Sequence, residues 1–185
     1  MSIEKEFLTV DLLIESDAST RAVDAFTISY IKAERQMRKL FTYLVYQSSG
    51  FSKKDIKHIK KVINEDGRLY FQHFIKGFDL MSPKSLSELI GEDYNKYLKD
   101  FERYKSYRHK IFHGQLTNSS LTRSDLEKVV QSVKFWCKLI AKNAEKEIGY
   151  DGFKRNSFRK SKLKFNLKDQ IEDISDLKKL LKQIK

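Results

Sequence analysis

Apolar residues recur at every third or fourth position along most of the chain, the spacing of helices that bury one face. The longest such pattern predicts a helix from about Ser19 to Gln47, and the apolar segment 7–14 before it is interpreted as a further helix. The apolar positions of the long helix are Val23, Phe26, Ile31, Met37, Leu40, Phe41, Leu44 and Val45.

Helix-breaking residues divide the middle of the chain into shorter helices. After Ser48-Ser49-Gly50, a basic helix is expected from Lys53 to Asn64, followed by an aromatic helix over residues 69–78. Ser82-Pro83 predicts the start of a short helix that ends at Gly91, because proline at the first helical position has no amide hydrogen to lose.

Two longer helices follow, separated by a polar loop over residues 117–123. The first is expected from Asp93 to His113 and stops at Gly114. Ser124 and Glu127 have capping-box spacing and predict the start of the second, which ends before Gly149. Its buried stripe consists of Val129, Val130, Val133, Trp136, Cys137, Ile140 and Ala144. A short loop between two helices makes them antiparallel neighbours, which favours a helical bundle.

The character of the chain changes at Tyr150. Residues 150–185 contain eleven Lys or Arg against five Asp or Glu, so +6 of the net charge of +12 lies in this segment. We therefore predict a bundle over residues 1–149 and a basic extension over residues 150–185. The extension opens with a turn at 150–153, and residues 163–167 form either a short strand or an extended arm. The extension closes with a short amphipathic helix that docks on its own bundle or on a partner; its apolar residues are Ile174, Leu177, Leu180, Leu181 and Ile184.

Composition agrees with an all-α fold and narrows the class of protein. Seven Gly and one Pro make up about 4% of the chain against an average near 12%, which leaves little room for the turns of a β-sandwich. The single cysteine, Cys137, excludes an internal disulfide framework and is interpreted as a core residue. No apolar run approaches the roughly 20 residues that span a bilayer, so we expect a cytoplasmic protein. The net charge favours a polyanionic partner.

The candidate chemistry lies at the end of the helix predicted over residues 93–113. Arg108 is followed by the polar His109, and His113 comes five residues after Arg108, directly before Gly114. An Arg and a His at this distance mean little alone, since Arg68 and His73 share the spacing. The context is more informative, because the negative end of the helix dipole stabilises a protonated side chain in the last turn.

Arg108, His109 and His113 resemble the Arg-polar-x3-His motif of the HEPN superfamily (higher eukaryotes and prokaryotes nucleotide-binding). Tyr107–Gln115, Trp136-Cys137 and Glu147–Phe153 look closest to a plasmid-associated prokaryotic branch, and the resemblance extends over residues 19–160. It implies an HEPN-like helical bundle and a homodimeric, metal-independent endoribonuclease without a cofactor, of a kind that often acts as a toxin or defence effector beside an antitoxin.

The resemblance also implies roles for single residues. Arg108 would orient and neutralise the scissile phosphate. His113 would act as general acid or base, and His109 would polarise or position His113. Glu34 is the candidate for a charged residue that faces the motif from an early helix. Because positions five apart on an ideal helix point about 140° apart, we expect one chain to converge poorly and two chains to share a cleft across a two-fold axis.

Several alternatives stay open. His109 and His113 are four residues apart, as two zinc ligands on a helix would be, but no third ligand stands nearby. The function is either RNA cleavage or, in a catalytically inactive HEPN module, binding of RNA or a partner protein; a DNA-binding helical protein is a third possibility. The predicted RNA-binding cations are Lys110, Lys154, Arg155, Arg159, Lys160 and Lys162. Phe153, Phe158 and Phe165, interleaved with the basic extension, either stack on bases or pack it onto the bundle.

Overall fold

The computed structural model describes residues 3–65, 67–113, 121–154 and 157–185. Every regular element within these ranges is a helix, which confirms the all-α class. Gly114, residues 117–120 of the polar loop and Arg155 lie outside the described residues.

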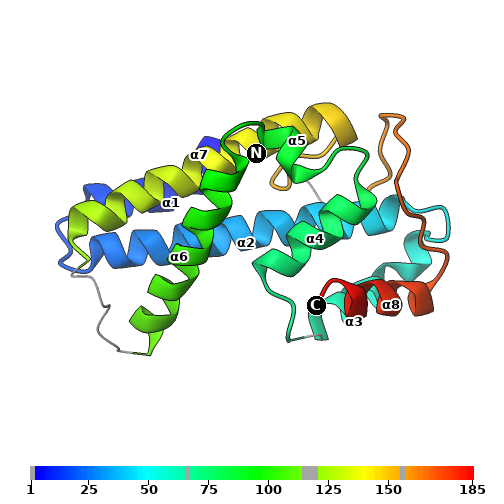
Figure 1. The fold of residues 1–185 in the computed structure, drawn as a ribbon, viewed down its shortest axis with the longest axis horizontal. Helices are drawn as coiled ribbons and strands as arrows, with labels where there is room; N and C mark the ends of the chain where they lie inside the picture. The colour runs from blue at the N-terminus through cyan, green and yellow to red at the C-terminus, as the bar shows by residue number, and fades with distance from the viewer. Residues whose placement is uncertain (1–2, 66, 114–120, 155–156) are drawn as a thin grey trace.

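The long helix α2 (Arg21–Gln47) forms the centre of the molecule. It packs against α1 (Ile3–Glu15), α4 (Phe71–Met81) and α7 (Arg123–Ile148), and Figure 1 shows α7 running along α2 for much of its length. The buried residues of α2 form a stripe at helical spacing over its first turns, whereas residues 40–46 near its C-terminal end are all buried.

Helix α6 (Tyr94–Phe112) crosses α2 steeply, after the short α5 (Leu86–Ile90) (Figure 1). The fully buried Trp136 of α7 anchors it, with its ring centroid 5.0 Å from that of Phe101 and 5.7 Å from that of Tyr97. Packed aromatic rings of this kind stabilise beyond the area they bury. They fix the N-terminal half of α6, and its C-terminal half continues past α2 (Figure 1).

The short 3-10 helix η1 (Lys53–Asp55) leads into α3 (Ile56–Glu65), and the closing helix α8 (Ile174–Gln183) packs against α3. Figure 1 shows these two helices side by side. The apolar residues of α8 are buried, Leu177 completely and Leu181 at 3% exposure. The amphipathic C-terminal helix therefore docks on its own bundle, the first of the two outcomes left open by its pattern.

The start predicted for the short helix at Ser82-Pro83 is wrong. Ser82 instead ends α4, since its N–H donates to the carbonyl oxygen of Phe78 at 2.7 Å. Helix α5 begins three residues later, where the Ser85 side chain and the Glu88 carboxylate cap each other's backbone N–H groups. The start of α7 is also shifted, but by two residues towards the N-terminus.

The capping box of α7 consists of Thr122 and Asp125, not Ser124 and Glu127. Glu127 is engaged elsewhere, because its carboxylate accepts a hydrogen bond from Arg123 one turn earlier at 2.7 Å. The sequence thus predicted the start of the helix to within two residues but the wrong pair of capping residues.

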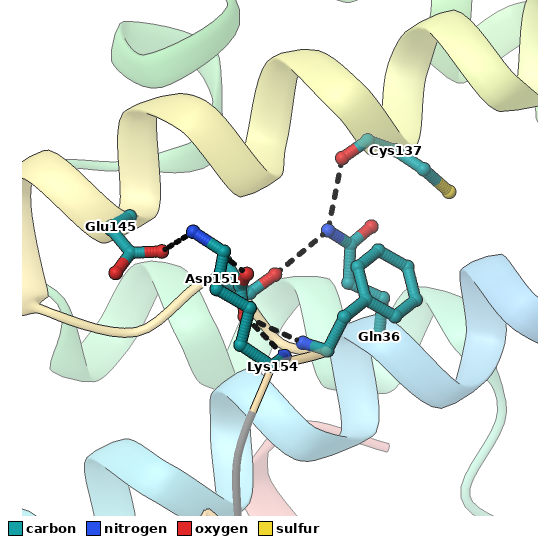
Figure 2. A network of polar contacts seen from close by, with 6 residues as sticks. Gln36, Cys137, Glu145, Asp151 and Lys154 are labelled. Atoms are coloured by element: carbon teal, nitrogen blue, oxygen red, sulfur yellow. Dashed lines mark hydrogen bonds and ion pairs between the residues drawn. The ribbon is translucent and has the colours of Figure 1, made fainter. Parts of the chain in front are cut away.

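The C-terminal segment contributes to the same hydrophobic core as the bundle. Tyr150 packs on Tyr43 with ring centroids 4.7 Å apart, and Phe153 meets Phe7 edge-on at 6.3 Å. Figure 2 shows the polar part of this junction, where the Gln36 amide donates to the carbonyl oxygens of Cys137 and Asp151. Residues 163–167 contain no strand and run along the surface as an extended arm.

Candidate functional site

A cleft of about 690 Å³ lies beside the C-terminal half of α6. Side chains from α2, from the start of α4 and from α6 line it, and we call it the α6 cleft. Its lining includes Arg108, His109 and His113, so the structure brings all three residues of the sequence motif to one place.

Arg108 is held between two aromatic rings. Its guanidinium carbon lies 5.4 Å from the ring centroid of Tyr30 and 5.5 Å from that of Phe112. A terminal guanidinium nitrogen lies 3.6 Å from a carboxylate oxygen of Glu34, while the buried Nε has no hydrogen-bond partner among the described residues. The side chain is 35% exposed, so this positioned cation remains accessible to an anion in the cleft.

Glu34 faces the motif from α2, as predicted for this residue. Burial raises the pKa of its carboxyl group, and the nearby charges of Arg108, Arg38 and Lys105 counteract part of that rise. Burial also raises the pKa of the Tyr30 hydroxyl. Glu34 therefore stands in a water-poor part of the cleft wall, where it can hold Arg108 in place.

His109 and His113 expose their imidazoles to solvent at the end of α6. Their ring centroids are 4.4 Å apart, and the N–H of His113 donates to the carbonyl oxygen of His109, which caps the helix. Two neighbouring imidazoles can supply both a proton donor and a proton acceptor within one cleft.

The expectation that one chain would converge poorly is wrong at the level of geometry. Arg108 and His113 line the same cleft of a single chain. The 140° separation assumes an ideal helix over both positions, but His113 is the C-cap and has left helical geometry, with φ −95° and ψ 9°.

The predicted RNA-binding cations of the extension occupy different surroundings. Lys154 binds Glu145 at 2.9 Å and lies 3.6 Å from Asp151 (Figure 2), while Lys160 donates to the carbonyl oxygens of Tyr46 and Ser48. Arg159 and Lys162 are exposed, and Arg155 lies outside the described residues. None of the described cations of the extension, nor Lys110 on α6, lines the α6 cleft.

The aromatic residues of the extension pack onto the bundle. Phe153 is 4% exposed, and Phe158 meets Tyr46 at 5.6 Å between ring centroids. Phe165 is also packed against the core. These contacts decide in favour of the second of the two interpretations of the interleaved phenylalanines.

Sequence reasoning missed the aromatic and cationic neighbours of Arg108 in the α6 cleft. Lys105 and Phe112 lie three residues before and four residues after Arg108, so helical spacing alone would have placed them on its face. Tyr30 lies one turn before Glu34 on α2, so helical spacing would likewise have placed it on the face of Glu34. Tyr70 precedes α4 and is close only in space, with no sequence signal to reveal it.

Other candidate chemistry finds less support in the described residues. They contain no group of three or more His, Cys, Asp or Glu side chains arranged to hold a metal ion. Cys137 is a buried core residue, as predicted, and burial raises the pKa of its thiol. No described helix has the length and apolar character needed to cross a bilayer.

Comparison with known proteins identifies no relative. No protein-family model, curated protein or solved structure matches the chain.

Proposed function

We propose that this protein is a metal-independent endoribonuclease of the HEPN type, which cleaves single-stranded RNA in the α6 cleft. The observation that carries the proposal is that one short segment, Arg108 to His113, presents a guanidinium and two exposed imidazoles to a single cleft. These are the groups needed to neutralise a phosphate and to move two protons. The net charge of +12 fits a polyanionic substrate.

In the proposed reaction the RNA supplies its own nucleophile. An imidazole accepts the proton of a 2′-hydroxyl, and the 2′-oxygen forms a bond to the adjacent phosphorus. The bond from phosphorus to the 5′-oxygen breaks, and that oxygen receives a proton from the acid. The products are a 2′,3′-cyclic phosphate and a 5′-hydroxyl end.

The residues of the α6 cleft divide these tasks. Arg108, fixed by two aromatic rings, neutralises charge on the non-bridging phosphate oxygens. His113 serves as general acid or base, and His109, 4.4 Å away, is its positioning or proton-transfer partner. Glu34 holds the guanidinium through its contact at 3.6 Å and leaves the exposed part of it for the substrate.

The proposal includes a homodimer and a cellular role. A two-fold pairing would place a second pair of imidazoles beside the first and enclose the substrate. Sedimentation equilibrium tests the pairing, since a monomer at micromolar concentration would contradict it. In the cytoplasm such an enzyme would act as a toxin or defence effector, with an antitoxin protein as the partner that restrains it.

The central experiment incubates end-labelled single-stranded RNA with the purified protein in EDTA. We expect cleavage with 2′,3′-cyclic phosphate ends, reduced by about 10²-fold or more in His113→Ala and Arg108→Ala. Arg103→Ala is the matched control, because Arg103 lies on the same helix but pairs with Asp100 and does not line the α6 cleft. Circular dichroism checks the fold of each variant. Equal cleavage by all four proteins would refute the assignment.

One observation favours the second candidate, an HEPN module that binds RNA without cutting it. Arg108 already has an anionic partner in Glu34, as in a site whose cation is structural. The same assay separates the two functions: intact RNA that is retarded in a mobility-shift gel, without new ends, supports the binding module.

A further inference from the structure

A second cleft, of about 580 Å³, lies between α3 and α8, and half of its lining residues are Lys or Arg. We call it the α3–α8 cleft. Its basic lining residues are His58, Lys61, Arg68, Lys178, Lys182 and Lys185, against a single carboxylate from Glu65. The helices meet through apolar faces, so their basic faces are directed outward along the joint.

Three of these cations are not used to hold the fold together. Lys61, Lys178 and Lys182 are exposed and form no ion pair with any residue in the described part of the chain. This differs from Lys179 on the same helix, which is paired with Asp176 at 2.9 Å. Exposed like charges around one cleft repel one another, and a bound polyanion removes that repulsion.

The two clefts are neighbours, because the segment between α3 and α4 lines both. Gly67 and Arg68 line the α3–α8 cleft, and Tyr70, two residues further on, lines the α6 cleft. Tyr70 is 48% exposed, and the Nζ atom of Lys105 lies 5.7 Å from its ring centroid. An exposed aromatic ring between cations is a platform on which a base can stack.

The buried His73 packs behind this segment. Its ring centroid is 5.6 Å from that of Tyr70. Burial lowers the pKa of the His73 imidazole; a backbone hydrogen bond with Arg68 opposes this, and the charges of nearby lysines add to the lowering.

We propose that single-stranded RNA binds along one cationic track, which starts at Arg108 in the α6 cleft, passes over Tyr70 and continues into the α3–α8 cleft. This inference rests on the proposed function and adds the substrate class, an RNA several nucleotides longer than the cleaved step. RNA is favoured over an acidic protein because the track alternates cations with an exposed aromatic ring, and bases stack where carboxylates do not. A dinucleotide would occupy the α6 cleft alone.

The first experiment measures binding of a long unstructured RNA to the full chain as salt is varied. The triple variant Lys61→Ala/Lys178→Ala/Lys182→Ala should lower the affinity about tenfold or more at moderate salt and reduce the slope of log K against log salt by about 2. The control Lys138→Ala/Lys142→Ala/Lys146→Ala removes the same charge from exposed lysines of α7 that line neither cleft and should leave the slope nearly unchanged. Equal losses in both triple variants, or none, would overturn the track.

The second experiment tests the aromatic step and the nature of the polyanion. Tyr70→Ala should weaken binding of the long RNA about fivefold or more, whereas Tyr70→Phe, which keeps the ring, should bind like the parent. If poly-glutamate binds with the same dependence on the three lysines as RNA does, the site takes an acidic protein and the inference is wrong.

Cleavage of a dinucleotide separates the two proposals. The lysine triple variant should cut a dinucleotide at the parental rate, because its lysines lie outside the α6 cleft. Lysine-dependent binding of long RNA without any cleavage would sink the proposed enzyme and leave the track standing. If the lysine triple variant still cuts RNA and binds long RNA with parental affinity, the track is wrong and the proposed enzyme stands.

Discussion

Two basic segments of this protein look alike in sequence, but the fold places their cations in different surroundings. The end of α6 and the stretch 154–162 each combine cations with aromatic residues. In the first, Lys105, Arg108 and Phe112 line an open cleft. In the second, Lys154 is held by carboxylates and Lys160 by backbone carbonyls.

The difference lies in how many contacts the fold gives each cation: Arg108 meets one carboxylate at 3.6 Å, whereas Lys154 meets two carboxylates and Lys160 two carbonyl oxygens. Residues 154–162 cross the end of α2, where unsatisfied carbonyl groups attract a lysine. The end of α6 projects beside α2 and meets one carboxylate, that of Glu34. Four tests, from the largest effect to the smallest, probe this contrast.

Aromatic residues should show the contrast most strongly. Phe153→Ala removes a side chain that is 4% exposed and packed on Phe7, and should lower the free energy of unfolding by about 3 to 5 kcal/mol. Phe112→Ala, at a position 60% exposed, should change it by less than about 0.5 kcal/mol while impairing cleavage. Urea denaturation measures both, and similar losses would remove the distinction.

Histidine burial gives a pH-dependent test. The buried His73 accepts a hydrogen bond from the backbone N–H of Tyr70 at 3.1 Å, and its lowered pKa means that the unfolded chain takes up the proton first. The free energy of unfolding should therefore fall as the pH drops through about 6.5 towards the lowered pKa.

The variant His73→Gln should flatten this pH dependence, while His58→Ala, which removes an exposed imidazole, should retain it. Thermal unfolding followed from pH 7 to pH 5 provides the measurement. An unchanged acid response in His73→Gln would assign the effect to another group.

Lys160→Ala tests whether this cation belongs to the fold. It removes two hydrogen bonds to the carbonyl oxygens of Tyr46 and Ser48 and should cost about 1 kcal/mol of stability, with RNA affinity close to that of the parent. Chemical denaturation and RNA titration of the same sample decide the case. A large loss of affinity at parental stability would return Lys160 to the RNA-binding set.

The exposed cations Arg159 and Lys162 remain predicted RNA-binding residues, with the smallest effect. They line neither cleft, so Arg159→Ala/Lys162→Ala should reduce the salt slope of RNA binding by less than about 1. A loss as large as that of the lysine triple variant would move the RNA path onto the extension.

Much of the fold could be predicted because helical periodicity is a local property of the chain. The spans of α2, α6, α7 and α8 follow from apolar spacing and from terminal signals such as Gly149, whose φ of 76° requires a residue without a side chain. Helix starts were less certain, because Ser85 and Thr122 compete for capping with nearby residues that fit the same pattern. In the structure the Ser82 N–H bonds to the end of α4, and Glu127 pairs with Arg123, so Ser85 and Thr122 are the caps.

The sequence by itself determined the all-helical class, the order of the helices and the position of the Arg108–His113 motif, since each depends on neighbours along the chain. Only tertiary structure decided that Glu34 and Tyr30 from α2 would meet Arg108, that Tyr70 would line the α6 cleft, and that Lys160 would bind backbone carbonyls. The physical reason is that the availability of a charge depends on burial and on partners brought close by packing, and neither is encoded in local spacing.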